Sequence, residues 1–144
     1  GRTITGAHGI PVGCDIAEED VIPDEIDMMV LPGGMPGMLN LERSAKVNAF
    51  VDYAYENQKL VCAICAAPSI LGHKGMLKGK KAVCFPGFES ELEGAELSDS
   101  FVVTDGNIIT AKGMGSAVKF GIAIGAAFVG EAKMKKIEES LQCS

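Results

Sequence analysis

The chain has 144 residues, of which 47% are hydrophobic and 22% are charged, and its formal net charge at pH 7 is −6. This length and composition predict one globular domain with a sizeable core and exclude a largely disordered chain. The negative charge, with no basic run longer than Lys80-Lys81 or Lys135-Lys136, argues against nucleic acid or an anionic membrane surface as the partner.

Cysteine usage and hydropathy indicate the compartment. The five cysteines are an odd number at irregular spacings, which argues against a secreted disulfide framework and for a reducing, cytoplasmic environment. The longest apolar stretch, residues 120–130, is too short to cross a bilayer. Its Gly121-x-x-x-Gly125 spacing therefore predicts close helix packing inside the domain.

The first part of the chain predicts short strands that end at glycine turns. Residues 4–12 favour a strand, a tight turn and a return strand. Residues 26–31 form an apolar run typical of a buried strand, and Pro32-Gly33-Gly34 follows it. Two glycines at a strand end let backbone amides approach a ligand or a neighbouring turn closely. A tight turn with no further role is an equal interpretation of this stretch alone.

A helix and a second buried strand lead to Cys65. Ser44 is a typical N-cap for a helix that ends near residue 56. The apolar run 60–64 predicts a strand buried on both faces, and Pro68 marks the start of another helix. Cys65 thus lies at a strand-to-helix turn, where a nucleophile is lifted off the sheet and the N–H groups of the new helix face its charge.

Three other roles for Cys65 remain open at this point. Free cysteines near strand ends are often structural and buried. Cys62 and Cys65 also have the C-x-x-C spacing of a thiol–disulfide motif, although the strand pleat turns Cys62 toward the core. A metal site would need a second cluster, and Cys14, Cys84, Cys143 and the two histidines are isolated along the chain, so we expect neither metal nor cofactor.

The second half alternates strands, turns and helices. Residues 82–85 predict a buried strand, and the glutamate-rich residues 88–97 predict an exposed flap or short helix. Asp105-Gly106 joins two strands across residues 101–110 in a hairpin with a primed turn. A helix is expected after residues 112–116, running to about residue 129, and a final helix over residues 131–141. His73 is expected on the surface near a helix C-terminus.

This alternation predicts an α/β fold, a doubly wound sandwich with a mostly parallel sheet and one hairpin. Ligands bind such sheets beyond the carboxyl ends of the strands. The Gly33-Gly34 turn, Cys65 and the loop of residues 113–115 all fall at such ends. Their joint presence favours Cys65 as a nucleophile over the structural alternative.

Three segments, taken in order and spacing, closely resemble the motifs of the DJ-1/ThiJ/PfpI superfamily. They are Leu31-Pro32-Gly33-Gly34, Ala63-Ile64-Cys65-Ala66-Ala67-Pro68 and Lys112-Gly113-Met114-Gly115-Ser116-Ala117. The resemblance covers essentially the whole chain and is greatest to the ThiJ-like branch. The protease-like branch has histidine at the position of Ala66, so a Cys-His dyad would lack its base and peptidase activity is not expected.

The resemblance implies a flavodoxin-like sheet, of the class I glutamine amidotransferase-like type, in a single domain of residues 1–144. It implies a homodimer and Cys65 as the reactive thiolate of a nucleophile elbow. Backbone amides of Gly33, Gly34 and Ala66 would then form an oxyanion site. The residues implied as pocket wall are Phe85, Gly113, Met114 and Gly115.

The same resemblance implies chemistry on small reactive carbonyls. Family members are credited with glyoxalase or deglycase activity on methylglyoxal and its adducts. A carboxylate would then have to move a proton, and no motif places one in this chain; Glu89 and Glu91 are the weak candidates. An alternative makes Cys65 an oxidative-stress sensor that is oxidised to sulfenic and sulfinic acid. Chaperone activity and a role in thiamine metabolism are further alternatives within the superfamily.

Two departures from the family pattern bear on these expectations. The family pattern begins with a strand and a helix that have no counterpart in this sequence. That helix carries a glutamate beside the reactive cysteine. We therefore expect an N-terminally incomplete fold, with that segment present as a separate chain or lost. Phe85 also stands where the human-like branch has a histidine near the cysteine, which makes the expected pocket wall apolar, and Lys112 replaces a common arginine.

Overall fold

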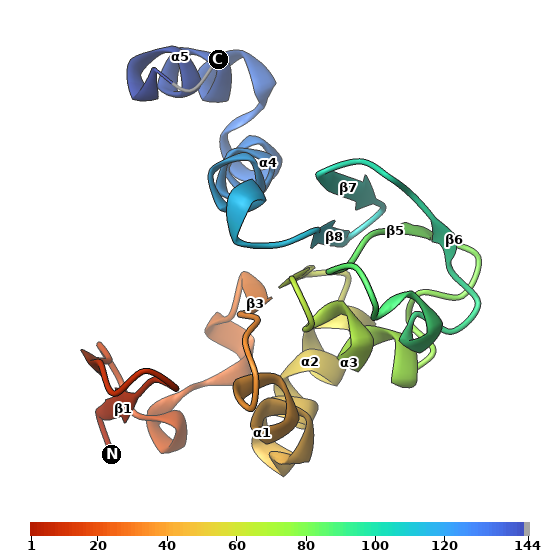
Figure 1. Cartoon of the computed structure of the whole chain (residues 1–144). Helices are drawn as coiled ribbons and strands as arrows, with labels where there is room; N and C mark the ends of the chain where they lie inside the picture. The colour runs from red at the N-terminus through yellow and green to blue at the C-terminus, as the bar shows by residue number, and fades with distance from the viewer. Residues whose placement is uncertain (143–144) are drawn as a thin grey trace.

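A four-stranded sheet forms the centre of the computed structural model, which describes residues 1–142 (Figure 1). Its spatial order is β3 (Met28–Leu31), β4 (Leu60–Ile64), β8 (Ile108–Ala111) and β7 (Val102–Asp105). The first three strands are parallel, and β7 pairs antiparallel with β8 through the predicted Asp105-Gly106 turn. The predicted α/β fold with a mostly parallel sheet is thus confirmed.

The strands of this sheet are apolar because helices cover both of its faces. Val61 and Ala63 of β4 face one core cluster, whereas Cys62, between them, faces the other. All four residues of β8 are buried. Such double burial is typical of parallel strands and explains the continuous apolar runs of the sequence.

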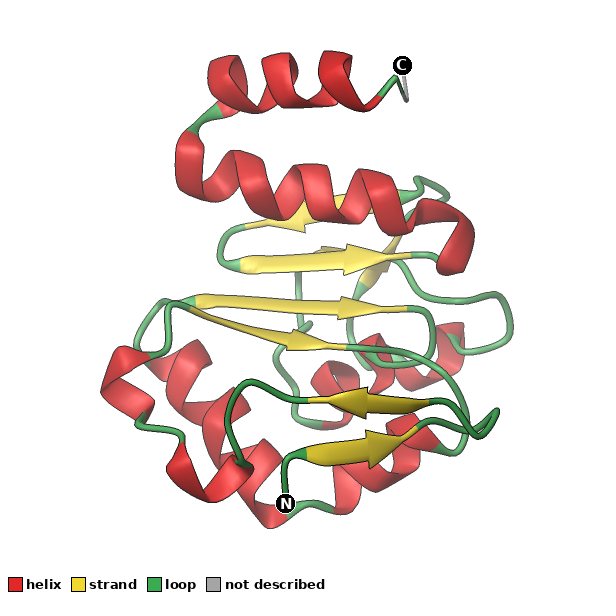
Figure 2. Ribbon diagram, turned by 90° about the vertical axis from the view of Figure 1, so that its left-hand side faces the viewer, coloured by secondary structure: helices red, strands yellow, loops and turns green. Residues whose placement is uncertain are grey.

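Helices lie on both sides of the sheet (Figures 1 and 2). The hydroxyl of Ser44 accepts a hydrogen bond from Val47 N–H at 3.2 Å, which confirms the predicted N-cap of α2. One face of the sheet carries α1 (Gly37–Arg43), α2 (Ala45–Glu56) and α3 (Pro68–His73). The other face carries α4 (Ala117–Val129), and α5 (Glu131–Leu141) packs on α4.

Close helix packing was predicted at Gly121 and Gly125 of α4, and the structure shows it at Gly125. A Cβ added to Gly125 would lie 2.5 Å from Sδ of Met134 in α5, whereas a Cβ on Gly121 would meet nothing within 4 Å. None of the helices in residues 1–142 combines the length and apolar content that a bilayer crossing requires.

Two short pairs of strands lie outside the central sheet. β1 (Thr3–Thr5) and β2 (Pro11–Gly13) form an exposed antiparallel hairpin, as predicted for residues 4–12. β5 (Lys81–Ala82) pairs with β6 (Glu96–Leu97), and between them lies the 3-10 turn η3 (Glu89–Glu91). The predicted strand over residues 82–85 is wrong beyond Ala82, because Val83 N–H donates to the Thr110 hydroxyl and Phe85 N–H to the Cys65 carbonyl.

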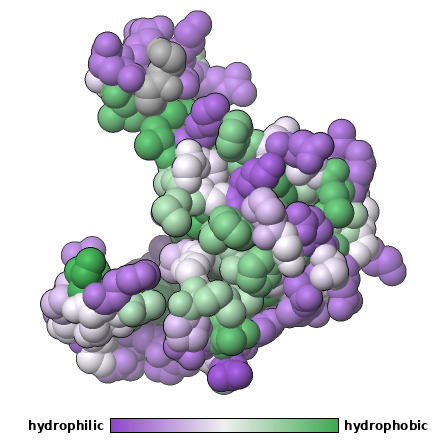
Figure 3. All heavy atoms as spheres, viewed as in Figure 1, coloured by the Kyte–Doolittle hydropathy of each residue, from purple (hydrophilic) through white to green (hydrophobic). Residues whose placement is uncertain are grey.

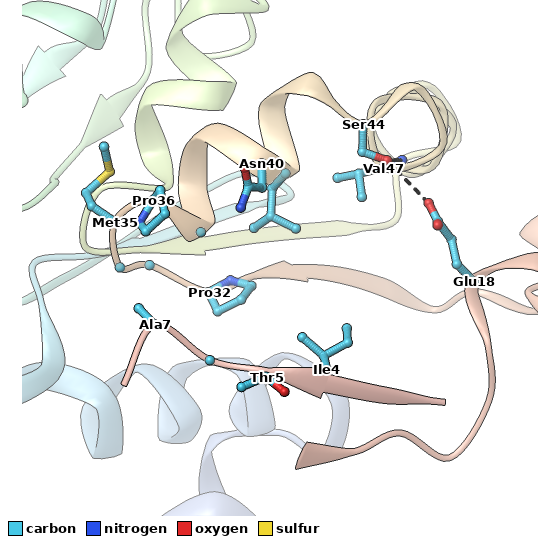
Figure 4. Close-up of a pocket in the computed structure, with 15 residues that line it drawn as sticks. Ile4, Thr5, Ala7, Glu18, Pro32, Met35, Pro36, Asn40, Ser44 and Val47 are labelled. Carbon is cyan, nitrogen blue, oxygen red and sulfur yellow. Dashed lines mark hydrogen bonds between the residues drawn. The ribbon is translucent and has the colours of Figure 1, made fainter. Parts of the chain in front are cut away.

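The hairpin of β1 and β2 does not join the central sheet (Figure 2). Within residues 1–142 no strand pairs with the outer edge of β3, and Val30 in this strand is 41% exposed. A cavity of about 680 Å³ separates the hairpin from the turn that joins β3 to α1 (Figure 4).

Candidate active site at Cys65

Cys65 occupies a strained turn between β4 and α3. Its φ of 66° lies in the left-handed region, which costs a residue other than glycine on the order of 1–3 kcal/mol. Two backbone hydrogen bonds hold the turn: Cys65 N–H donates to Ala111 O at 2.9 Å, and Phe85 N–H donates to Cys65 O at 2.8 Å. The thiol is free and partly exposed. This is the geometry of a nucleophile lifted from the end of a strand.

The Gly33-Gly34 turn touches Cys65. A Cβ added to Gly33 would lie 2.5 Å from Cys65 Cβ, 2.8 Å from the Ile64 carbonyl oxygen and 3.3 Å from Cys65 Sγ. No side chain fits in that space. The contact arises because β3 and β4 are parallel neighbours, with Leu31 opposite Ala63, so their carboxyl ends meet.

The two turns that meet at Cys65 carry unused backbone donors. Within the described chain, the N–H groups of Gly33, Gly34 and Ala66 donate no hydrogen bond. By contrast, Ala67 N–H is engaged with Ile64 O at 3.1 Å. Gly34, with a φ of 91°, is fixed by Met38 N–H of α1, which donates to its carbonyl at 2.9 Å. Such preset N–H groups can bind a developing oxyanion.

The structure brings two of the four wall residues together. A Cβ on Gly113 would lie 3.1 Å from the ring of Phe85, which is itself 43% exposed. Met114 is 87% exposed and Gly115 is also exposed, so the Met114 side chain lies mostly in solvent. The Ser116 hydroxyl closes this loop, accepting from Gly113 N–H at 3.1 Å and donating to Gly113 O at 2.7 Å.

Replacing Ser116 with alanine is expected to lower the free energy of unfolding by about 1–2 kcal/mol. The hydroxyl is almost fully buried, and its loss leaves Gly113 N–H without a partner. Urea unfolding followed by circular dichroism measures the change. Ser140→Ala is the matched control, because that hydroxyl is exposed on α5, and we expect a change below about 0.5 kcal/mol. Equal losses in both variants would contradict this role of Ser116.

The other described thiols are poor partners for Cys65. Cys62 is fully buried on the opposite face of the sheet, and burial raises its pKa to about 12. Burial, followed by the charge of Glu89, raises the pKa of Cys84 to about 11, and the charge of Cys65 adds to this. Cys14 lies beyond β2, and Cys143 lies outside the described residues.

The carboxylates named from the sequence lie on the loop that follows Phe85. Glu89 accepts a hydrogen bond from Gly87 N–H at 2.7 Å, and Glu91 Oε2 lies 2.7 Å from Nε2 of His73. No described carboxylate is hydrogen-bonded to the Cys65 thiol, and no described cluster of His, Cys, Asp and Glu has the geometry of a metal site.

One polar cluster has no counterpart in the sequence predictions. His73 lies between Glu42 and Glu91, which come from different elements and are separated from it by many residues. The hydrogen bonds that the ring makes to Glu42 and then to Glu91 raise the pKa of His73, and accepting the bond from His73 lowers the pKa of Glu91. No spacing in the sequence could have revealed this arrangement.

The cavity beside the hairpin is separate from the thiol. Its lining includes Gly33 and Gly34 but not Cys65, and Figure 4 shows Ile4 and Thr5 of β1 opposite Pro32 and Asn40. The Gly33-Gly34 turn therefore lies between the cavity and the thiol of Cys65.

Known proteins resemble this chain in sequence and in structure. A family model described as the DJ-1/PfpI family matches residues 1–127. DJ-1 homolog B of Arabidopsis thaliana is 31% identical over 96% of this chain, and a deglycase of Thermococcus kodakarensis is 39% identical over 76% of it. The crystal structure of Drosophila melanogaster DJ-1beta matches with a TM-score of 0.91 at 28% identity, covering 100% of this chain and 78% of that one.

These matches confirm the flavodoxin-like fold expected from the motifs. The chain spans 32% of the length of the Arabidopsis protein and 66% of that of the deglycase. The family model, in contrast, covers most of the chain and includes all three motifs on which the resemblance was based. The chain therefore belongs to the DJ-1/PfpI family.

Proposed function

We propose that this protein acts through Cys65 on small reactive carbonyl compounds such as methylglyoxal, as a glyoxalase or deglycase. The observation that carries the proposal is the contact between the thiol of Cys65 and the Gly33-Gly34 turn, beside N–H groups that donate to nothing else. A nucleophile and its oxyanion donors are thereby held together before substrate arrives.

The proposed reaction begins with addition. The Cys65 thiolate forms a bond to the aldehyde carbon, and the carbonyl electron pair moves to the oxygen. The N–H groups of Gly34 and Ala66 stabilise that oxyanion, and each lowers the activation free energy by on the order of 3 kcal/mol. Protonation gives a hemithioacetal. Transfer of the C1 proton to C2 through an enediol, with the hydroxyl proton passing from the C1 oxygen to the C2 oxygen, then gives a thioester of lactate, which water hydrolyses to lactate and the free thiol.

The proton transfer needs a carboxylate, and we propose Glu89. Glu89 lies on the loop that follows Phe85, and Phe85 N–H donates to the Cys65 carbonyl at 2.8 Å, so the same loop carries this carboxylate and contacts the Cys65 turn. Glu91 is less suited, because its carboxylate is bonded to His73. Relatives named as deglycases, at 36–39% identity over 76% of this chain, support the substrate class.

A turnover assay tests this proposal. Purified protein is incubated with excess methylglyoxal, and lactate is measured enzymatically against time. We expect lactate well beyond one equivalent of protein. Cys14→Ser is the control and should keep the wild-type rate, since Cys14 lies in a different part of the fold. Loss of only one equivalent of methylglyoxal, with no lactate, would contradict turnover.

A second function is favoured by the partial exposure of a free thiol. Cys65 could be oxidised by peroxide to the sulfenic and then the sulfinic acid, and so act as a sensor. This alternative gives a stoichiometric mass increase at Cys65 and no lactate. The two functions need the same thiol and are separated by turnover alone.

We further propose that the chain forms a homodimer through α4 and α5. Figure 3 shows apolar surface where these helices project from the body. Its exposed large apolar residues are Val118, Phe128, Val129, Ile137 and Leu141. Several large apolar side chains exposed on two neighbouring helices are typical of an interface. Sedimentation equilibrium should give twice the mass of the chain, and a monomer at high micromolar concentration would contradict the proposal.

A further inference from the structure

His73 connects three elements at the surface. It lies at the C-terminal end of α3, and its Nδ1 is 2.5 Å from Glu42 Oε1 near the end of α1. Its Nε2 is 2.7 Å from Glu91 Oε2 in η3. The three side chains are only 35%, 30% and 46% exposed, so water replaces these contacts incompletely.

The elements joined by His73 carry the two sides of the Cys65 site. In the first turn of α1, Met38 N–H donates a hydrogen bond to the Gly34 carbonyl. At the other side, η3 follows Phe85, whose N–H binds the Cys65 carbonyl, and Phe88 N–H donates back to Phe85 O at 3.1 Å. A change in the distance between α1 and η3 would therefore move the oxyanion turn relative to the apolar wall.

Backbone packing places η3 directly against α3. A Cβ added to Gly72 would lie 2.0 Å from Glu91 O and 2.9 Å from Leu92 Cα. The residue after Gly72 is thus held where its ring reaches Glu91. The fold therefore fixes the backbone of His73 beside that of Glu91.

The bridge depends on the charge of the ring. A neutral imidazole has one N–H donor, whereas the imidazolium has two, and here both ring nitrogens face carboxylates. The neighbouring Lys74 is paired elsewhere, since its Nζ is 2.7 Å from Asp52 Oδ1. The Ser90 hydroxyl donates to the second oxygen of Glu91.

The direction of the pH dependence follows from these contacts. The pKa of His73 is raised above its ordinary 6.5. Its contribution to the stability of the folded protein is therefore complete below about pH 6.5 and is lost as the pH rises through the raised value. The pKa of Glu91 is lowered below 4.5, so its contribution to the stability of the folded protein is lost only as the pH falls through that lower value.

We infer that His73 is a positioning residue for the Cys65 site: as the imidazolium it clamps α1 to η3, and on deprotonation it releases them. The effect on Cys65 rests on the proposed function, whereas the clamp itself does not. Two readouts are therefore needed, one of which is independent of the thiol.

The first readout is amide hydrogen exchange of residues 86–92, measured by mass spectrometry and corrected for intrinsic exchange rates. His73→Gln keeps a polar side chain but cannot carry the charge. We expect this variant to exchange about two- to fivefold faster than wild type near pH 6, and equally fast near pH 9. His8→Gln, in the exposed hairpin turn, should match wild type at both values.

Glu42→Gln provides a second variant, since it removes one carboxylate and leaves the histidine. It should reproduce the faster exchange near pH 6. The same difference at both pH values would assign His73 a packing role only, and no difference at either would exclude the clamp.

The second readout is the rate at which iodoacetamide alkylates Cys65 in His73→Gln and in wild type. We expect the ratio of the two rates to deviate from one near pH 6 and to return to one near pH 9. Altered exchange with a ratio of one throughout would overturn the positioning role while leaving the clamp. Altered exchange and alkylation in a protein that forms no lactate would instead refute only the proposed function.

Discussion

Cys65→Ser is expected to lower lactate formation from methylglyoxal by at least about 10³-fold, with the far-ultraviolet circular dichroism unchanged. A serine hydroxyl is not ionised at neutral pH, and no described base lies within hydrogen-bond distance of the Cys65 side chain to activate it. The substitution is nearly isosteric, so the hydrogen bonds of the turn to Ala111 and Phe85 should persist. Initial rates under excess methylglyoxal measure the loss.

The interpretation of that result depends on the fold being intact. Thermal unfolding of Cys65→Ser should stay within a few degrees of wild type, because the side chain is only partly buried. Residual turnover within tenfold of wild type would mean that another group performs the addition.

Gly33→Ala should reduce both stability and the reactivity of the thiol. The new methyl would lie 2.5 Å from Cys65 Cβ and 2.8 Å from the Ile64 carbonyl, so the turn or the cysteine must shift. Overpacking of this kind costs about 1–3 kcal/mol. The same shift moves the oxyanion donors, and a misplacement of about 1 Å can lower the rate on the order of 100-fold. Urea unfolding and the lactate assay measure the two effects.

Gly37→Ala is the matched control for this substitution. Gly37 begins α1 four residues later, and a Cβ there would meet nothing within 4 Å. Alanine favours the helix, so we expect wild-type activity and unchanged or slightly higher stability. If Gly33→Ala and Gly37→Ala behave alike, the contact between the glycine turn and Cys65 does not control the site.

Much of the fold could be predicted because local signals and burial agree. The apolar run before Cys65 forms the predicted strand β4, since parallel strands buried on both faces need no polar alternation. The Ser44 N-cap and the Asp105-Gly106 hairpin were equally predictable, because each depends on the chemistry of a few neighbouring residues. Motif order placed Gly33 and Cys65 at adjacent strand ends.

Other features depend on contacts that no local pattern encodes. Residues 83–85 are apolar, yet Val83 N–H donates to the Thr110 side chain and Phe85 N–H to the Cys65 turn, so neither forms a backbone ladder with a strand. The separation of the β1–β2 hairpin from the central sheet is a property of tertiary arrangement. The His73 bridge joins side chains from three elements, and helix position predicted only a surface histidine.

The most direct measurement is the order in which the five cysteines react. The folded protein is treated with less than one equivalent of iodoacetamide and digested, and each cysteine peptide is quantified by mass spectrometry. We predict that Cys65 carries most of the label, ahead of the partly exposed Cys14 and of the buried Cys62 and Cys84. Label mainly on Cys14, with Cys65 unmodified, would contradict the assignment of Cys65 as the reactive nucleophile of this protein.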